Sequence, residues 1–229
     1  MLNLIKLEIK KMKVGSVLLS FIGINLGIIS LLLLLGIDPE AASEFLTSYE
    51  SVFMLIEMFV VAASVIYASV LLSSMIIEEF KDKTITVLFM YPVNRKKILL
   101  SKLTIISFIT FFFVSMSNII VFLSFYYLNT NLHYISAPLT QDLLMEKAIH
   151  IFVISIACAG MSLIPLLFGM IKHSVSATVI SSILIVAILS SSTDNGTNLF
   201  SFVFVPIILG VSGFVIAYAV INKAVKADL

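Results

Sequence analysis

The amino-acid sequence predicts an all-α integral membrane protein with a single transmembrane domain over residues 1–229, and three observations support this. Apolar residues make up 60% of the 229 residues and charged residues only 12%, whereas soluble domains have about 45–50% and about 25%. The mean hydropathy is +1.16. Apolar runs near the roughly 20 residues that cross a bilayer recur along the chain. From these runs we predict six transmembrane helices: 14–35, 52–77, 103–128, 148–170, 175–192 and 199–221.

Residues 1–13 have the pattern of an amphipathic helix at the cytoplasmic membrane interface. Apolar residues recur at spacings of three and four, while lysines follow a second face: Leu2, Ile5, Ile9 and Met12 on the first, and Lys6, Lys10 and Lys13 on the second. Such a helix lies among lipid headgroups, where its lysines meet anionic lipid. A charged leader without an interfacial role is the alternative. The run at 14–35 exceeds the about 7–15 apolar residues of a signal peptide, so we expect a retained span.

The later spans carry residues that disturb or tighten a helix. Hydroxyl residues interrupt the run at 175–192, where they can bond to backbone or to neighbouring helices, and a re-entrant segment is the alternative to a full crossing. Pro165 and Pro206 are expected to kink the fourth and sixth spans. Cys158 is expected to be a small core residue. Small residues in the second span predict close packing and interhelical hydrogen bonds: Ser64, Ala68, Ser69 and Ser73.

The distribution of basic residues predicts the orientation. With the N-terminus in the cytoplasm, thirteen of the fourteen Lys and Arg lie inside and only Lys147 lies outside. Because Lys and Arg are enriched in cytoplasmic loops, both termini are predicted to be cytoplasmic. We expect a multi-pass protein of the cell membrane, of bacterial origin.

Residues 78–102 form a strongly charged segment between the second and third spans, with six of the fourteen Lys and Arg. Pro92 disfavours helix at the residue before it and lacks an N–H, so a helix capped by Thr84 should end near Met90. Three residues would form its apolar face: Ile85, Leu88 and Phe89. After the proline break, a basic anchor can reach headgroup phosphates at the start of the third span: Arg95, Lys96 and Lys97.

This segment resembles a motif of the membrane subunits of type-two ATP-binding-cassette (ABC) exporters. In that family the loop between spans 2 and 3 carries one or two acids, a Thr, an apolar helix that ends before Pro, a small polar residue, an Arg and then a Lys. The matching positions are Glu78, Glu79, Thr84, Val87, Leu88, Pro92, Asn94, Arg95 and Lys102. The chain departs from the pattern at Lys83, where the family often has Gly. The N-terminal amphipathic helix and the six spans resemble the family too.

The resemblance implies that the loop holds a short coupling helix, which docks on a separate ABC ATPase subunit. The implied docking residues are Glu78, Glu79, Lys83, Thr84, Leu88, Phe89, Pro92 and Arg95. No GxxxxGK[ST] motif is present, so we expect no cofactor in this chain, no enzyme activity, and ATP and Mg bound by the partner. The resemblance also implies a second permease copy or a homologous permease, and export of an amphipathic or hydrophobic substrate: a peptide antibiotic or toxin, a lipid or a drug. Partners would include membrane lipid but no nucleic acid.

Glu57 and Asn118 are the candidates for the substrate pathway, because both are polar residues within apolar runs. An acid in the hydrocarbon core is costly and is therefore a functional candidate. The second span is long enough, however, to put Glu57 in the outer interface, and Asn118 can serve helix packing instead. The three histidines lack the spacing of metal ligands, so no metal site is predicted.

Two other functions remain open from the sequence. A proton-coupled secondary transporter would use Glu57, although such proteins usually carry more intramembrane charge. An intramembrane metal-dependent protease is suggested by the pair Glu78 and Glu79. It would need an Arg where the chain has Lys83, and histidines deep in later helices, which are absent.

Overall fold

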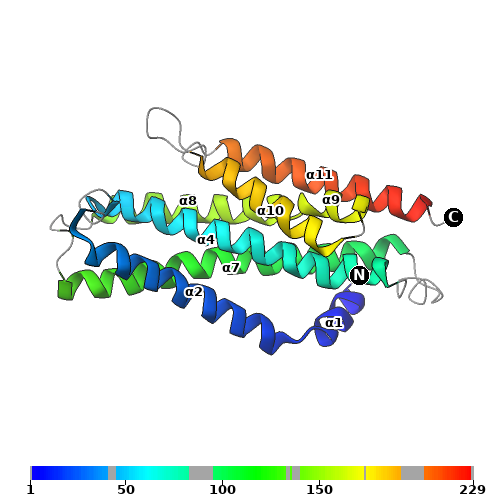
Figure 1. Cartoon of the computed structure of the whole chain (residues 1–229), viewed down its shortest axis with the longest axis horizontal. Helices are drawn as coiled ribbons and strands as arrows, with labels where there is room; N and C mark the ends of the chain where they lie inside the picture. The colour runs from blue at the N-terminus through cyan, green and yellow to red at the C-terminus, as the bar shows by residue number, and fades with distance from the viewer. Residues whose placement is uncertain are drawn as a thin grey trace.

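The computed structural model describes residues 2–40, 45–82, 95–132, 135, 140–172, 174–191 and 204–227. Every regular element in these ranges is helical, which confirms the all-α prediction. The long helices lie roughly along one axis, and both termini lie at the same end of the bundle (Figure 1).

The chain begins with a short helix, α1 (Leu2–Lys11), and turns at Met12 and Lys13 into the first long helix, α2 (Val14–Ile37). The next helical run is continuous but contains one π-helical turn. The elements that follow α2 are α4 (Tyr49–Leu72), the π-helix η1 (Ser73–Ile77), α5 (Glu78–Lys81), α7 (Arg95–Leu132), α8 (Gln141–Met161), α9 (Pro165–Lys172), α10 (Val175–Ser190) and α11 (Phe204–Ala227).

Five helical stretches of the described chain are long and apolar enough to cross a membrane: Val14–Ile37, Tyr49–Lys81, Arg95–Thr130, Gln141–Lys172 and Phe204–Lys223. The predicted count of six is not confirmed, because α10 has only 16 residues. At about 1.5 Å per residue it spans about 24 Å, which is less than the hydrocarbon core of about 30 Å. It runs from the end of the bundle that holds both termini towards the opposite end, where α11 begins (Figure 1), so it does not turn back as a re-entrant segment would. One of the predicted interhelical hydrogen bonds forms here, since the hydroxyls of Ser69 in α4 and Ser182 in α10 lie 2.9 Å apart.

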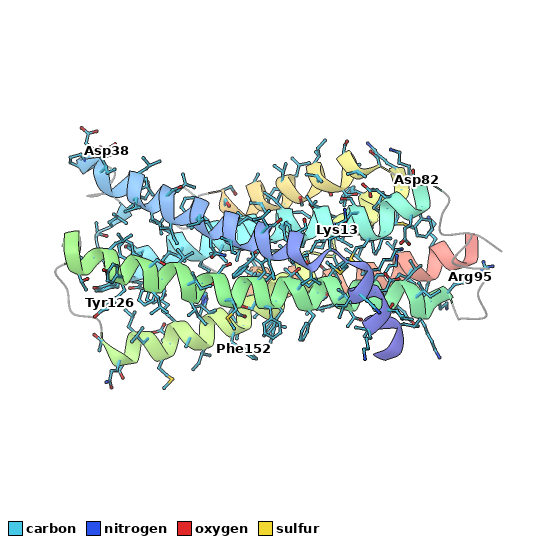
Figure 2. All side chains as sticks on the ribbon, turned by 90° about the horizontal axis from the view of Figure 1, so that it is seen from below. Lys13, Asp38, Asp82, Arg95, Tyr126 and Phe152 are labelled. Atoms are coloured by element: carbon cyan, nitrogen blue, oxygen red, sulfur yellow. The ribbon has the colours of Figure 1, made fainter. Side chains whose placement is uncertain are left out.

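Basic residues gather at the end of the bundle that holds both termini, which we call the basic end. It comprises α1, α5, the start of α7 and the last residues of α9 and α11. Figure 2 shows Asp82 and Arg95 there, whereas Asp38 lies at the opposite end. The separation of charge along the chain is therefore also a separation in space, as a protein with both termini on one side of a membrane requires.

The fourth predicted span is interrupted before Pro165, which confirms the predicted distortion. The helix α8 ends at Met161 and α9 begins at Pro165. Between them the backbone tightens to three-residue spacing, with hydrogen bonds from Leu163 N to Gly160 O at 3.0 Å and from Leu166 N to Leu163 O at 3.1 Å. The kink expected at Pro206 stays a prediction. Pro206 is the third described residue of α11, and the residue four positions before it lies outside the described residues.

The closest helix packing joins α8 to α11 and depends on three glycines. A Cβ at Gly160 would collide with the carbonyl oxygen of Gly210, and a Cβ at Gly213 would collide with the carbonyl oxygen of Gly160. At Gly210 it would lie 2.6 Å from the carbonyl oxygen of Ala157. Backbones approach this closely in membranes only where small residues leave room, so these glycines fix the position of α11.

We predict that Gly213→Val lowers the midpoint of thermal unfolding by about 2–12 °C, because a side chain there forces the helices apart and overpacking costs about 1–3 kcal/mol. Cys158 is the one cysteine of the chain and, as predicted, is buried in the core. A dye that fluoresces on reaction with a thiol therefore reports unfolding in detergent. Gly23→Val is the matched control, since nothing lies within 4 Å of a Cβ there. Equal midpoints for the two variants would contradict the packing argument.

Candidate functional site

The charged segment 78–102 lies at the basic end, and the structure describes its two flanks. Glu78 and Glu79 are the first residues of α5, and Arg95 is the first residue of α7, so the third span opens at the predicted basic anchor. Five of the predicted docking residues lie outside the described residues: Lys83, Thr84, Leu88, Phe89 and Pro92. The short coupling helix itself therefore stays a prediction.

Lys102, seven residues into α7, is only 1% exposed. Its Nζ donates a hydrogen bond to the carbonyl oxygen of Met75 at 2.8 Å and another to the carboxylate of Glu79. It also lies 3.8 Å from Oε1 of Glu8. Burying an ammonium group is costly unless its donors and its charge find partners. Here they are supplied by three elements that flank α7, namely α1, η1 and α5.

A second lysine extends these contacts to the surface. Nζ of Lys11 in α1 lies 3.0 Å from Oε1 of Glu79. This hydrogen bond raises the pKa of Lys11 above its ordinary value of 10.5, and the charge of Glu8 acts in the same direction. A raised lysine pKa means that the stabilisation is complete below 10.5 and is lost only as the pH rises above that value. We refer to Glu8, Lys11, Glu79 and Lys102 as the charge network.

The π-helix η1 lies directly before the acidic pair. At its end the N–H of Glu78 bonds to the carbonyl of Ser73, five residues earlier, instead of four. Such a turn is wider than an α-helical one and is frequent at functional sites. The Met75 carbonyl in this widened turn is the one that accepts a hydrogen bond from Lys102. The irregular turn and the buried lysine therefore belong to the same site.

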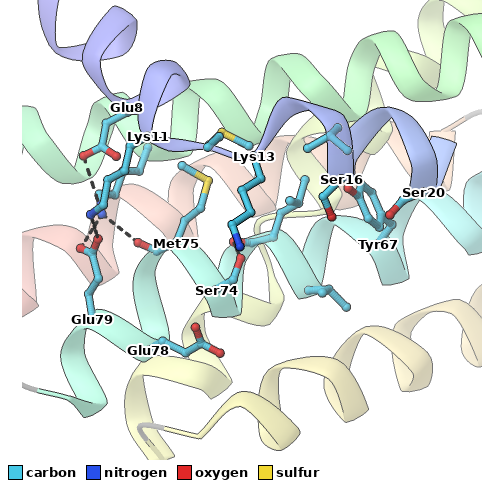
Figure 3. A pocket seen from close by; sticks show the side chains of 15 residues that line it. Glu8, Lys11, Lys13, Ser16, Ser20, Tyr67, Ser74, Met75, Glu78 and Glu79 are labelled. Atoms are coloured by element: carbon cyan, nitrogen blue, oxygen red, sulfur yellow. Dashed lines mark hydrogen bonds and ion pairs between the residues drawn. The ribbon is translucent and has the colours of Figure 1, made fainter.

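A cavity of about 560 Å³ opens beside the charge network, between α1–α2 and α4–η1–α5. In the close view, Glu8, Lys11 and Glu79 lie at one end of it, and Ser16 and Ser20 of α2 lie towards the other (Figure 3). The α2 side and the α4 side are thus joined by ion pairs at the basic end and separated by open space further along. This arrangement leaves room for α2 to move relative to α4.

The pathway candidates lie far from this site, towards the opposite end. Glu57 in α4 is 7% exposed and Asn118 in α7 is 3% exposed, so both side chains are buried inside the bundle. Asn118 donates to the Val114 carbonyl of its own helix at 2.9 Å. Oε1 of Glu57 lies 3.0 Å from Nδ1 of His150 in α8. The sequence does not predict this pair, because the two residues lie on different predicted spans and belong to no motif.

The charge network was also only partly anticipated. Glu79 and Lys102 belong to the loop motif, but Glu8 and Lys11 were assigned to no site. Lys11 lies off the predicted lysine face of residues 1–13 and forms an ion pair with Glu79. The feature of the sequence that could have indicated the charge network is Glu8, the one acid among four lysines in residues 1–13. An acid on an otherwise basic helix indicates a cationic partner elsewhere in the fold.

Comparison with known proteins agrees with these features. The family model described as "ABC-2 family transporter protein" matches residues 4–187, from α1 into α10. A relative from Bacillus subtilis (strain 168), the uncharacterized protein YcbO, is 36% identical over 228 residues, which cover 99% of this chain and 100% of that protein. No solved structure matches the chain. The apolar helical bundle and the family match together show that the chain belongs to the ABC-2 family of transporter proteins.

Proposed function

We propose that the chain is the permease subunit of an ATP-driven ABC exporter in a bacterial cell membrane, with both termini in the cytoplasm. It moves an amphipathic or hydrophobic substrate outward, such as a peptide antibiotic, a lipid or a drug. Membership of the ABC-2 family supports a transporter permease. It also argues against the intramembrane protease and the proton-coupled transporter, which belong to other families.

The observation that carries the proposal is the charge network on both flanks of the docking segment. Glu79 lies four residues before residue 83 and Lys102 lies eight residues after residue 94, and the two side chains form an ion pair. Any displacement of residues 83–94 by a docked ATPase therefore acts on α5 and α7 together. Through Lys11 and Glu8 it also acts on α1. The network would make the segment a single mechanical unit with the membrane helices.

The partners follow from this assignment. A separate ABC ATPase binds ATP and Mg and docks on the coupling segment. A second copy of the chain, or a homologous permease, completes the transporter, since the helices described here are about half the usual number for such exporters. The lysines of α1 that do not join the network, such as Lys6 and Lys10, face anionic lipid.

The proposal predicts that affinity purification of the tagged chain from native membranes in mild detergent recovers an ATPase with a P-loop. The recovered complex should hydrolyse ATP at a rate above that of the ATPase alone. Mass spectrometry identifies the partner, and a phosphate-release assay gives the rate. Recovery of the permease with no nucleotide-binding subunit would contradict the proposed function.

Leu88→Asp should abolish recovery of this ATPase while membrane insertion is kept, because it places a charge on the apolar face predicted for the coupling helix. Thr86→Asp, which adds the same charge off that face, is the matched control. Co-purification from equal amounts of inserted permease gives the result. If the ATPase still binds the Leu88→Asp variant, Leu88 is not part of the docking surface.

The ion pair of Glu79 and Lys102 should link stability to ATP-driven coupling. Glu79→Gln, Lys102→Met and the double variant form a cycle, and we expect the two changes to interact by at least about 1 kcal/mol, because each group neutralises the other in a partly buried site. The unfolding midpoint, reported by Cys158, measures stability, and the ATP hydrolysis of the complex measures coupling. In the control cycle, Lys97→Met takes the place of Lys102→Met, because Lys97 is an exposed lysine on the same helix. Additive effects at Glu79 and Lys102 would show that the pair is not a mechanical link.

A further inference from the structure

The half of the bundle away from the basic end contains a buried carboxylate whose bonding is incomplete. Glu57 lies in the apolar core between Phe53 and Val61. Oε1 of Glu57 and Nδ1 of His150 lie 3.0 Å apart, but neither atom makes a hydrogen bond of good geometry with any described residue. Buried polar atoms in proteins are almost always bonded, so these two atoms can each take a further partner, either water or a polar group of a ligand.

A ring contact places a second polar residue at the level of Glu57. Phe53 of α4 stacks on Phe122 of α7 with ring centroids 4.1 Å apart. The two helices run in opposite directions, so one turn towards the basic end leads from Phe53 to Glu57 on α4 and from Phe122 to Asn118 on α7. Asn118 is buried as well. Glu57 and Asn118 therefore lie at the same depth in the bundle.

A second ring contact brings α2 to the same depth. Phe21 of α2 meets Phe113 of α7 edge to face at 4.9 Å. These helices run in the same direction, so one turn further on lie Asn25 in α2 and Ser117 in α7. Asn25 is 4% exposed and Ser117 is fully buried. Oδ1 of Asn25 and Oγ of Ser117 also lack a hydrogen-bond partner among the described residues.

The atoms without partners share one chemistry. Oε1 of Glu57 and Oδ1 of Asn25 can only accept hydrogen bonds, and the Ser117 hydroxyl and a neutral imidazole can accept them too. The nearest basic residue along α8 is Lys147, three residues before His150, and it forms no ion pair with Glu57 in the described structure. The layer therefore combines one negative charge with several acceptors, and it lies in surroundings where an uncompensated anion is costly.

We propose that this polar layer, formed by the buried Asn25, Glu57 and Ser117 and the partly exposed His150, binds a protonated amine of the transported substrate. The ammonium group donates to the carboxylate of Glu57 and, as it enters, replaces His150 as the nearest neighbour. Asn25 and Ser117 supply further acceptors from the α2 side. Neutral and anionic groups are excluded, because neither compensates the carboxylate. The proposal deepens the transport function given above by naming the chemical class of the substrate, an amphiphilic amine.

The test measures binding without the ATPase, so that it is independent of docking. Dansylcadaverine carries a primary ammonium on an apolar fluorophore, and its N-acetyl derivative has the same fluorophore without the charge. Binding of each probe to the full chain in lipid nanodiscs is followed by fluorescence, against empty nanodiscs. We expect saturable binding of the amine only, and a loss of at least about tenfold in its affinity in Glu57→Gln, since a charge-assisted hydrogen bond is removed.

Further variants separate recognition from folding. Glu50→Gln, an exposed acid two turns earlier in α4, is the matched control and should bind as the original chain does. Asn25→Leu should weaken binding about threefold, whereas His150→Gln should leave it unchanged or stronger. If the unfolding midpoint shows that Glu57→Gln does not fold, Glu57→Asp, which keeps the charge, is compared with Glu57→Ala instead. Glu57→Asp should retain more affinity for the amine than Glu57→Ala.

Equal binding of the two probes, or unchanged affinity in a folded Glu57→Gln variant, would overturn the proposal. Loss of binding in both Glu57→Gln and His150→Gln would show instead that the pair only holds α4 against α8. The two proposals fail separately. If the chain binds the amine saturably but recruits no ATPase, the amine site stands and the exporter function is contradicted. If it recruits an ATPase but binds no amine, the exporter function stands and the amine site is contradicted.

Discussion

A buried ammonium group must have its donors satisfied and its charge compensated, and the basic end of this protein is arranged around that requirement. Lys102 is 1% exposed and has partners on three elements: Glu8 in α1, Met75 in η1 and Glu79 in α5. Loss of Glu79 would leave the charge of Lys102 without its nearest partner, and loss of the Met75 carbonyl would leave one of its donors unpaired. The lysine therefore fixes the positions of α1 and the end of the second span relative to α7. The widened turn at η1 belongs to this arrangement, because it presents the carbonyl that Lys102 requires.

Among the described residues, the two buried charged side chains have opposite surroundings. Lys102 is surrounded by partners, whereas Oε1 of Glu57 has only the imidazole of His150 beside it, without a hydrogen bond in the described structure. The first arrangement suits a rigid joint near the docking segment. The second suits a place where an external group is accepted for a time and released. A transporter needs both kinds of place, one to receive force and one to act on the cargo.

The spans could be predicted from the sequence because length and hydropathy are local properties, and five of the six predicted helices are long enough to cross. The fifth, at 175–192, is not confirmed as a full crossing, because α10 ends at Ser190 and has only 16 residues. The charge network and the close contact of Gly160 with Gly213 could not be predicted, since both depend on which helices meet. Glu57 was found because an acid in an apolar run is conspicuous. The pairing of Glu57 with His150 could not be predicted, because the two residues lie on different helices.

The length of α7 has a geometric consequence. Its 38 residues extend over about 57 Å at about 1.5 Å per residue, nearly twice the thickness of the hydrocarbon core, about 30 Å. A straight rod of this length converts a tilt of about 5° into a displacement of about 5 Å at its far end. Lys102 lies near one end of the rod and Asn118 lies beyond its middle. A small rotation imposed at the basic end would therefore reach the polar layer as a movement comparable to the size of an ammonium group.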